Sequence, residues 1–281
     1  MTDAIFISCG YRHTGVVLGN GNVILFGSNE YGQLGIINNT FSDPIFARDS
    51  ENNIIVDAKS ISCGKYNTAI VLNNSEVVSF GTRISLSLED NLNIDLFGSQ
   101  ILPKTMLDSN TNILSNVVHV SCGFNHSLIL LSNGEVASCG NNSYGEVGIG
   151  STIPVYLASI ISGMNNVKSI SCGMNHSAIV TGNGSLFLNG DGGFGQLGLG
   201  SLYYDAYLIR YVRITNVDNA KYVSCGDNYT TVLLSNDQII TFGNNYTGQF
   251  GNNNYIGSDI PIYSDMYPGK ITIALNDSFS F

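Results

Sequence analysis

The stretch that decides the fold is ISCGYRHTGVVLGNGNVILFGSNEYGQLG, residues 7–35. Its Ser-Cys-Gly tripeptide recurs along the chain, and each copy is followed at one constant offset by a further glycine. The five cysteines are Cys9, Cys63, Cys122, Cys172 and Cys225, and the glycines at the constant offset are Gly27, Gly81, Gly140, Gly190 and Gly243. A fixed internal period of about fifty residues is the mark of a repeat architecture.

A Gly-x-x-Gly box is the second constant feature, and in four copies it begins at the same offset from the cysteine. The four boxes are Gly32–Gly35, Gly145–Gly148, Gly195–Gly198 and Gly248–Gly251. In the second copy Leu86–Glu89 replaces the box, and the stretch Thr82–Asn116 fits the repeat poorly. No Lys-Ser/Thr follows these glycines, so the boxes are turn elements and not nucleotide-binding loops.

Each copy is expected to form short strands. In the fourth copy, Val167–Cys172 alternates apolar and polar residues, and His176–Thr181 is apolar and β-branched. Asn183-Gly184 then predicts a hairpin turn of type I′ leading into a strand over Ser185–Asn189. The expected fourth strand is Val155–Ile160, contributed by the preceding copy.

A four-stranded unit has two apolar faces and cannot bury both alone, so neighbouring units must stack. With this period, and without helical periodicity, the sequence predicts an all-β fold: a β-propeller of about five four-stranded blades with the opening of a sixth. The whole chain, residues 1–281, is expected to be one domain. Its repeats start near residues 5, 59, 118, 168 and 221, with a partial repeat from 271.

Composition narrows the possible partners. The net charge is −10, which repels phosphate backbones and favours basic partners over nucleic acid. No apolar run is long enough to span a bilayer, and no secretory signal is visible, so we expect a monomeric cytoplasmic protein. Richness in Asn and Ile is typical of AT-rich genomes; in an intracellular bacterium the protein would be delivered into a host cell.

The cysteines and histidines are expected to be structural. Five of the six cysteines share one repeat position, which predicts small buried residues, and their spacing matches no zinc site. His13, His126 and His176 also share one position, where Asn67 and Tyr229 stand in the other copies. We expect these histidines to brace a turn between two strands. No metal, cofactor or covalent catalytic constellation is predicted.

The pattern Ser-Cys-Gly-x-x-His-Ser/Thr, then Asn-Gly, then Phe-Gly-x-Asn-x-Tyr-Gly-Gln-Leu-Gly resembles the regulator of chromosome condensation repeat, and the resemblance covers nearly the whole chain. It implies a propeller that acts as a guanine-nucleotide exchange factor for a Ran-like small GTPase, an activity without covalent chemistry. The alternative is a non-catalytic protein–protein interaction scaffold. Thr82–Asn112 is either a degenerate blade or a counterpart of the wedge that the family's founding member inserts into its GTPase. The chain contains no Trp, which excludes the role of the ultraviolet-sensing relatives.

The candidate partner-binding residues are the variable pairs that follow each Ser-Cys-Gly. These pairs occupy one equivalent turn, so the fold should gather them on one rim, where binding residues are commonly held. They are Tyr11, Arg12, Lys65, Tyr66, Phe124, Asn125, Met174, Asn175, Asp227 and Asn228, with Asn276 and Asp277 from the partial repeat. The resemblance assigns the exchange role to acidic residues at this turn, hence to Asp227 and Asp277. The simpler interpretation is that all are ordinary variable turn residues.

Overall fold

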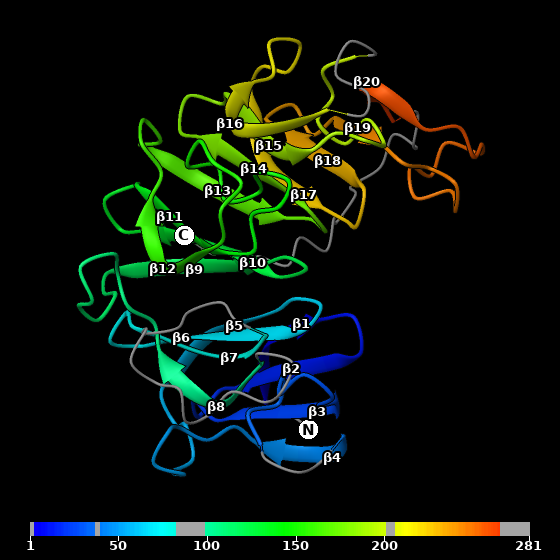
Figure 1. Cartoon of the computed structure of the whole chain (residues 1–281). Coiled ribbons are helices and arrows are strands. Elements are labelled where there is room, and N and C mark those ends of the chain that lie inside the picture. Colours follow the sequence, from blue (N-terminus) through cyan, green and yellow to red (C-terminus); the bar gives the residue numbers. More distant parts are fainter. Residues whose placement is uncertain (1–2, 37–39, 83–98, 201–205, 265–281) are drawn as a thin grey trace. The chain divides into compact units, whose positions relative to one another are not determined.

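The computed structural model describes residues 3–36, 40–82, 99–200 and 206–264, and these residues form twenty strands and no helix. The strands make five four-stranded antiparallel sheets, as expected of five propeller blades (Figure 1). Leu86–Glu89 and the partial repeat from 271, with Asn276 and Asp277, lie outside the described residues. The single-domain assignment remains a prediction.

Each blade is a simple meander in which every strand pairs with the next along the chain. Blade 1 consists of β1 (Ala4–Cys9), β2 (His13–Leu18), β3 (Val23–Ser28) and β4 (Phe41–Phe46). Blade 2 consists of β5 (Ala58–Cys63), β6 (Asn67–Leu72), β7 (Val77–Thr82) and β8 (Ser99–Thr105). Blade 3 consists of β9 (Val117–Cys122), β10 (His126–Leu131), β11 (Val136–Gly140) and β12 (Val155–Ile160). Blade 4 consists of β13 (Val167–Cys172), β14 (His176–Thr181), β15 (Leu186–Asp191) and β16 (Tyr207–Arg213). Blade 5 consists of β17 (Ala220–Cys225), β18 (Tyr229–Leu234), β19 (Ile239–Gly243) and β20 (Ser258–Tyr263).

The blades group into two compact units. Unit 1 comprises residues 1–141 and 154–161 and holds blades 1 to 3. Unit 2 comprises residues 142–153 and 162–281 and holds blades 4 and 5. The box of the third repeat, Gly145–Gly148, thus belongs to unit 2, where the side chain of Asn189 donates a hydrogen bond to the Gly145 carbonyl.

The prediction that Val155–Ile160 is the fourth strand of blade 4 is wrong. Val155–Ile160 pairs with β11 of its own repeat, and blade 4 is completed by Tyr207–Arg213, which pairs with β15. The strand that follows each box returns to the strand before the box, because an antiparallel pair needs only a local reversal of the chain. The box is therefore part of the third connection within a blade.

The Asn-Gly hairpins form, but their turns are not of type I′. Of Asn20 and Gly21 only Gly21 has a positive φ, 80°, and its N–H donates to the Leu18 carbonyl at 2.9 Å. This is a type I turn followed by a left-handed glycine, the three-residue hairpin connection. The Asn20 side chain accepts from the N–H of Asn22, so the asparagine acts through its side chain and not through its φ.

Apolar faces of adjacent blades within a unit stack into continuous cores. Blades 1 and 2 share a cluster that includes Val17, Leu25 and Ile61, all 2% exposed or less. Blades 2 and 3 share a second cluster, and blades 4 and 5 a third, centred on Leu188, Val223 and Phe242. Burial of this kind is the main term that holds repeat units together.

The described part of the poorly matching stretch completes blade 2; residues 83–98 lie outside the described residues, so the choice between a degenerate blade and a wedge counterpart remains a prediction. Its residues 99–105 supply β8, and the loop after β8 repeats the loop after β4. Asp108 accepts hydrogen bonds from the N–H groups of Asn110 and Asn112, as Asp49 does from Glu51 and Asn53. The hydrogen bonds to backbone and to Asn112 lower the pKa of Asp108.

Cys9 departs from the expected burial of the repeat cysteines. Cys63, Cys122 and Cys172 are buried, Cys225 is partly buried, and Cys9 is exposed. Two residues earlier in the strand the same difference appears: Ile7 is 59% exposed, whereas Ile61 of blade 2 is 2% exposed. Ile61 and Cys63 are buried against blade 1, where Gly15 approaches both side chains, whereas no described residue covers Ile7 and Cys9 in this way.

Candidate functional site

The turns after Ser-Cys-Gly are linked from blade to blade by backbone hydrogen bonds. The N–H of Tyr11 donates to the Gly64 carbonyl at 3.3 Å, and the N–H of Lys65 donates to the Gly123 carbonyl at 3.1 Å. In unit 2 the N–H of Met174 donates to the Asp227 carbonyl at 3.0 Å. The variable pairs of blades 1 to 3 therefore lie together, and so do those of blades 4 and 5.

Glycines make this close approach possible. A Cβ on Gly10 would run into the Gly64 carbonyl oxygen, and a Cβ on Gly64 would run into that of Gly123. The glycine at the constant offset after each cysteine has a related role. The first of these, Gly27, has a φ of 110°, and a Cβ there would meet the Arg12 carbonyl. The recurrent glycines are thus the sequence signal for the packed turns.

In unit 1 the turns form an aromatic–cation cluster, which we define as Tyr11, Arg12, Lys65, Tyr66 and Phe124. The Lys65 ammonium lies 3.5 Å from the ring centroid of Phe124 and 5.0 Å from those of Tyr11 and Tyr66. Arg12 lies 5.4 Å from the Tyr11 ring, and Tyr66 meets Phe124 edge to face at 5.3 Å. Such cation–π contacts hold the two charged groups in fixed positions.

A small hollow of about 200 Å³ adjoins the cluster. It is lined by Tyr11, Arg12 and Tyr66 from the turns, by Ser28 at the end of β3, and by Glu30, Tyr31 and Gln33 from the segment after β3. The ring of Tyr31 lies 4.0 Å from that of Tyr66, and the neighbouring Tyr66 phenol raises the pKa of Tyr31. The hollow is polar, with the buried side chains of Ser28 and Gln33 in its wall.

In unit 2 the turns have the opposite chemical character. Met174, Asn175 and Asn228 are partly buried, and Asp227 is exposed. The carbonyl of Asn228 accepts from the N–H of Asn244 at 2.8 Å, which ties the Asp227 turn to the segment after β19. No cation belongs to these four turn residues, so unit 2 presents one carboxylate where unit 1 presents two cations.

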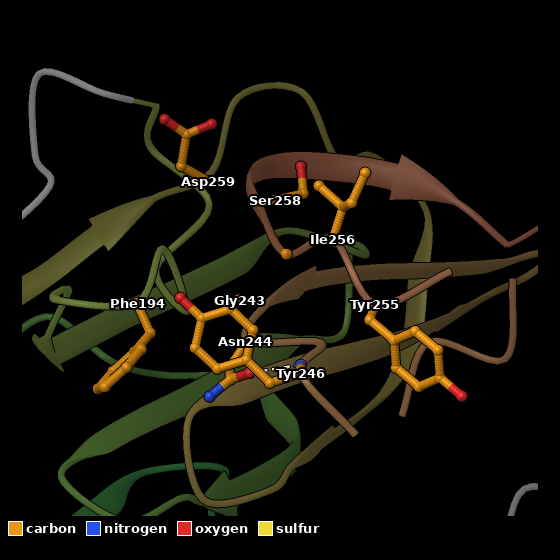
Figure 2. Close-up of a pocket in the computed structure, with 9 residues that line it drawn as sticks. Phe194, Gly243, Asn244, Tyr246, Tyr255, Ile256, Ser258 and Asp259 are labelled. Carbon is orange, nitrogen blue, oxygen red and sulfur yellow. Dashed lines mark hydrogen bonds between the residues drawn. The ribbon is translucent and has the colours of Figure 1, made fainter. Parts of the chain in front are cut away.

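A larger hollow of about 410 Å³ lies beside that segment in unit 2. Its wall carries Phe194, Tyr246 and Tyr255, and Ile256 and Asp259 come from the entry to β20 (Figure 2). Tyr246, Tyr255 and Ile256 are each at least 66% exposed. The surface beside the Asp227 turn is therefore aromatic, with Asp259 as a second, partly buried carboxylate.

The histidines brace neighbouring blades. His13 Nε2 lies 2.8 Å from the Thr68 hydroxyl, which donates to the Gln33 carbonyl at 2.7 Å. Because the Thr68 hydroxyl donates its hydrogen bond to the Gln33 carbonyl, it must accept the one from His13, and the hydrogen is therefore on Nε2 of His13. His176, Thr230 and Gln196 repeat this arrangement in unit 2. The prediction of a structural role fits, although the hydrogen bond reaches the next blade and not the histidine's own turn.

Burial lowers the pKa of His13 to about 4, an effect partly offset by its hydrogen bond to the Asn67 backbone. The ring is therefore neutral at pH 7 and is suited to a structural hydrogen bond rather than to proton transfer. In the described ranges there is no group of three or more His, Cys, Asp or Glu side chains that could hold a metal ion. The same residues contain no helix that is long and apolar enough to cross a membrane.

Comparison with known proteins identifies the repeat. Two family profiles, both described as the regulator of chromosome condensation repeat, match the chain: one at residues 4–33 and 117–146, the other at 20–71, 133–180 and 183–233. The chain belongs to the regulator of chromosome condensation repeat family. The matched ranges include the Ser-Cys-Gly turns of all five blades.

Similar proteins of this family are much longer than the chain. It is 30% identical to the probable E3 ubiquitin-protein ligase HERC6 of Homo sapiens over 86% of the chain and 23% of that protein. It is also 30% identical to the X-linked retinitis pigmentosa GTPase regulator homologue of Caenorhabditis elegans, over 52% of the chain and 10% of that protein. The chain thus spans a quarter or less of these two relatives.

Two solved structures support the propeller fold. Human WBSCR16 superposes with a TM-score of 0.77 at 20% identity, over 94% of this chain and 67% of that one. Prp20p of Saccharomyces cerevisiae superposes with a TM-score of 0.57 at 18% identity, over 92% of this chain and 76% of that one. That structure is described together with the binding of Prp20p to Gsp1p and histones.

The aromatic residues next to the box were not recognised from the repeat. Tyr31, Tyr144 and Phe194 each stand directly before the first box glycine, and Tyr31 and Phe194 line the two hollows. A signal was available, because the repeat pattern includes Tyr at that position. The stacking of Lys65 on three rings was not recognisable from the sequence, since it needs the side-chain directions of three blades at once.

Proposed function

We propose that this chain binds a small GTPase of the Ran type through the turns after Ser-Cys-Gly and promotes release of its nucleotide. The observation that carries the proposal is the backbone linkage of equivalent turns, which brings their variable side chains together within each unit. Exposed aromatic and charged side chains on rigidly held turns are typical of protein-binding surfaces. Tyr11 is 59% exposed, and Arg12 and Asp227 are exposed.

Membership of the family supports a GTPase as partner. Relatives that match about half of the chain are named GTPase regulators, and Prp20p is described as binding Gsp1p. The net charge of −10 would speed encounter with a basic surface on the GTPase.

The proposed exchange mechanism requires no covalent step. A protein that binds the nucleotide-free GTPase more tightly than the loaded form must, by linkage, weaken nucleotide binding by the same factor. Asp227 would supply a carboxylate that competes for the Lys and Mg²⁺ holding the nucleotide phosphates. Its exposed position at a turn pinned by the Met174 N–H leaves the side chain able to reach a partner.

A second function, binding without exchange, is favoured by one specific observation. Among the five described turn pairs only that of blade 5 contains a carboxylate, Asp227. The other pairs contain Arg12, Lys65 or uncharged residues. A scaffold would use the same turns and would bind loaded and empty GTPase with similar affinity, so it would not accelerate nucleotide release.

The test is release of a fluorescent guanine nucleotide from purified Ran. We expect micromolar concentrations of the protein to accelerate release, and the Asp227→Asn variant to lose most of that acceleration. Asp237→Asn is the matched control: Asp237 is also an exposed carboxylate of blade 5, at the opposite end of β18. Binding of Ran without acceleration would establish the scaffold function, and absence of binding to loaded and to empty Ran would refute both.

A further inference from the structure

The chemistry of the aromatic–cation cluster points to a partner segment that the proposed GTPase binding does not specify. We propose that the cluster binds an extended acidic peptide segment whose carboxylates stand two residues apart, one on Arg12 and one on Lys65. The inference rests on the proposed role of the turns as a binding surface and names the chemistry of what unit 1 would recognise.

Among the described residues, neither cation has an acidic partner. In the part of the chain that the structure describes, the ion-pair contact found is Arg213–Asp218, and no carboxylate lies within 4 Å of Arg12 or Lys65. The chain as a whole carries a net charge of −10, so these two cations form a local positive site on an acidic protein. The two positive charges therefore remain available to an acidic group from another molecule.

Aromatic rings hold the Lys65 ammonium in place but are weak partners for its N–H donors. Three ring centroids lie within 5.0 Å of its Nζ, and these rings are the contacts that hold the ammonium among the described residues. An ammonium has three N–H donors and no acceptor, and a ring face is a weak substitute for oxygen. A carboxylate oxygen would supply a charge-assisted hydrogen bond at little entropic cost, because the lysine is already ordered.

The two ring distances place an upper limit on the separation of the cations, and so on the length of the motif. Both lie over the Tyr11 ring, at 5.4 Å and 5.0 Å from its centroid, so they are at most about 10 Å apart. In an extended strand, residues i and i+2 point to one side and lie about 7 Å apart. Two acidic side chains at this spacing can reach both cations, whereas neighbouring acidic residues would point to opposite sides.

Nucleic acid is the weaker alternative for the same cations. A phosphate backbone places a charge at every nucleotide, and the overall negative charge of the protein repels a polyanion more than a peptide with few carboxylates. Glu30 lines the hollow beside the cluster and is the described carboxylate that would oppose any anion there. Replacing Glu30 by an uncharged residue should therefore strengthen peptide binding, whereas replacing Arg12 or Lys65 should weaken it.

The experiment measures anisotropy of a fluorescein-labelled peptide (Gly-Glu)₄ with the whole chain at low salt. We expect binding at least tenfold tighter than that of (Gly-Gln)₄ or of a peptide with the same four glutamates placed contiguously. Arg12→Gln and Lys65→Met should each weaken binding about three- to tenfold, as expected for loss of one charge-assisted contact. Glu30→Gln should strengthen it about twofold.

Lys221→Met is the matched control, because Lys221 lies 5.6 Å from the Tyr222 ring in unit 2 and carries the same kind of cation–π contact. It should leave binding unchanged within twofold. Equal binding of the glutamate and glutamine peptides, equal effects of Lys65→Met and Lys221→Met, or tighter binding of oligo(dT) than of the glutamate peptide would each overturn the proposal. Since Ran is absent from this assay, its outcome is independent of the exchange test with Asp227→Asn.

Discussion

Replacement of Thr68 by Val tests the hydrogen-bonded brace between blades 1 and 2. The Thr68 side chain is fully buried, and its hydroxyl joins His13 Nε2 at 2.8 Å to the Gln33 carbonyl at 2.7 Å. Valine has nearly the same shape but neither donates nor accepts. The substitution therefore leaves two buried polar groups, one N–H and one C=O, without their partner.

Each buried group left unsatisfied costs about 1–3 kcal/mol, so the free energy of unfolding should fall by about 2–6 kcal/mol. That is a large part of the roughly 5–15 kcal/mol typical of a folded domain. Thr68→Ser keeps the hydroxyl and loses one methyl group, at a cost of about 1 kcal/mol. Serine stands at this repeat position in blades 3 and 4, as Ser127 and Ser177.

The chain supplies an internal control in Thr14, which holds the same repeat position in blade 1. No histidine of a preceding blade reaches Thr14 among the described residues, and its hydroxyl makes one long contact with the Cys9 sulfur at 3.9 Å. Thr14→Val should change the free energy of unfolding by less than about 0.5 kcal/mol, as for other surface substitutions. Urea unfolding followed by far-ultraviolet circular dichroism measures all three variants. If Thr68→Val is no more destabilising than Thr14→Val, the brace makes no net contribution.

Three further predictions concern buried groups of unit 1. Burial lowers the pKa of His13 to about 4 from 6.5, so the unfolded chain binds its proton first. In urea titrations the free energy of unfolding should change little through this group above about pH 7, and should fall by about 2–3 kcal/mol between pH 7 and pH 4.5. The fall should be correspondingly smaller in His13→Asn, and equal pH slopes for the two proteins would contradict this. With Ellman's reagent at neutral pH, Cys9 should react at least a hundredfold faster than Cys63, whose pKa burial raises; a fast Cys63 would mean that blades 1 and 2 separate readily. Gly64→Ala should lose about 1–3 kcal/mol in the same urea assay, because the Cβ meets the Gly123 carbonyl, and an unchanged midpoint would show that the turns are not tightly packed.

Much of the fold was predictable from the spacing of a few residues. The glycines at the constant offset after each cysteine take positive φ because a side chain there would strike the preceding turn, as at Gly27 against Arg12. That requirement is local and the same in every repeat, so it leaves a regular trace in the sequence. The strands before and after the turn follow from alternation and β-branching in the same way.

The fourth strand of a blade was not predictable from the spacing of recurrent glycines and cysteines within the repeat. Tyr207–Arg213 does not carry a constant motif, and its pairing with β15 follows from the path of the chain after the box. The exposure of Cys9 was missed for a related reason, because the residue is identical in each repeat and only its neighbouring blade differs. Equivalent sequence therefore predicts equivalent local structure but not equivalent burial.

The candidate site was predictable in its position but not in its chemistry. The turn pairs lie together in each unit, yet their division into cations with aromatics in unit 1 and a carboxylate in unit 2 depends on which pairs are neighbours. Lys65 and Phe124 are far apart in sequence, and the 3.5 Å contact between them exists because the Lys65 N–H donates to the Gly123 carbonyl.

Hydrogen exchange of the protein with and without nucleotide-free Ran tests the proposed surface most directly. Both ends of the second strand of each blade are turns, so every repeat contains its own control. We predict slower exchange at residues 10–13, 64–67, 123–126, 173–176 and 226–229, and no change at the opposite turns around Gly21, Ser75, Gly134, Gly184 and Asp237. Protection of those opposite turns, with the Ser-Cys-Gly turns unaffected, would contradict the account.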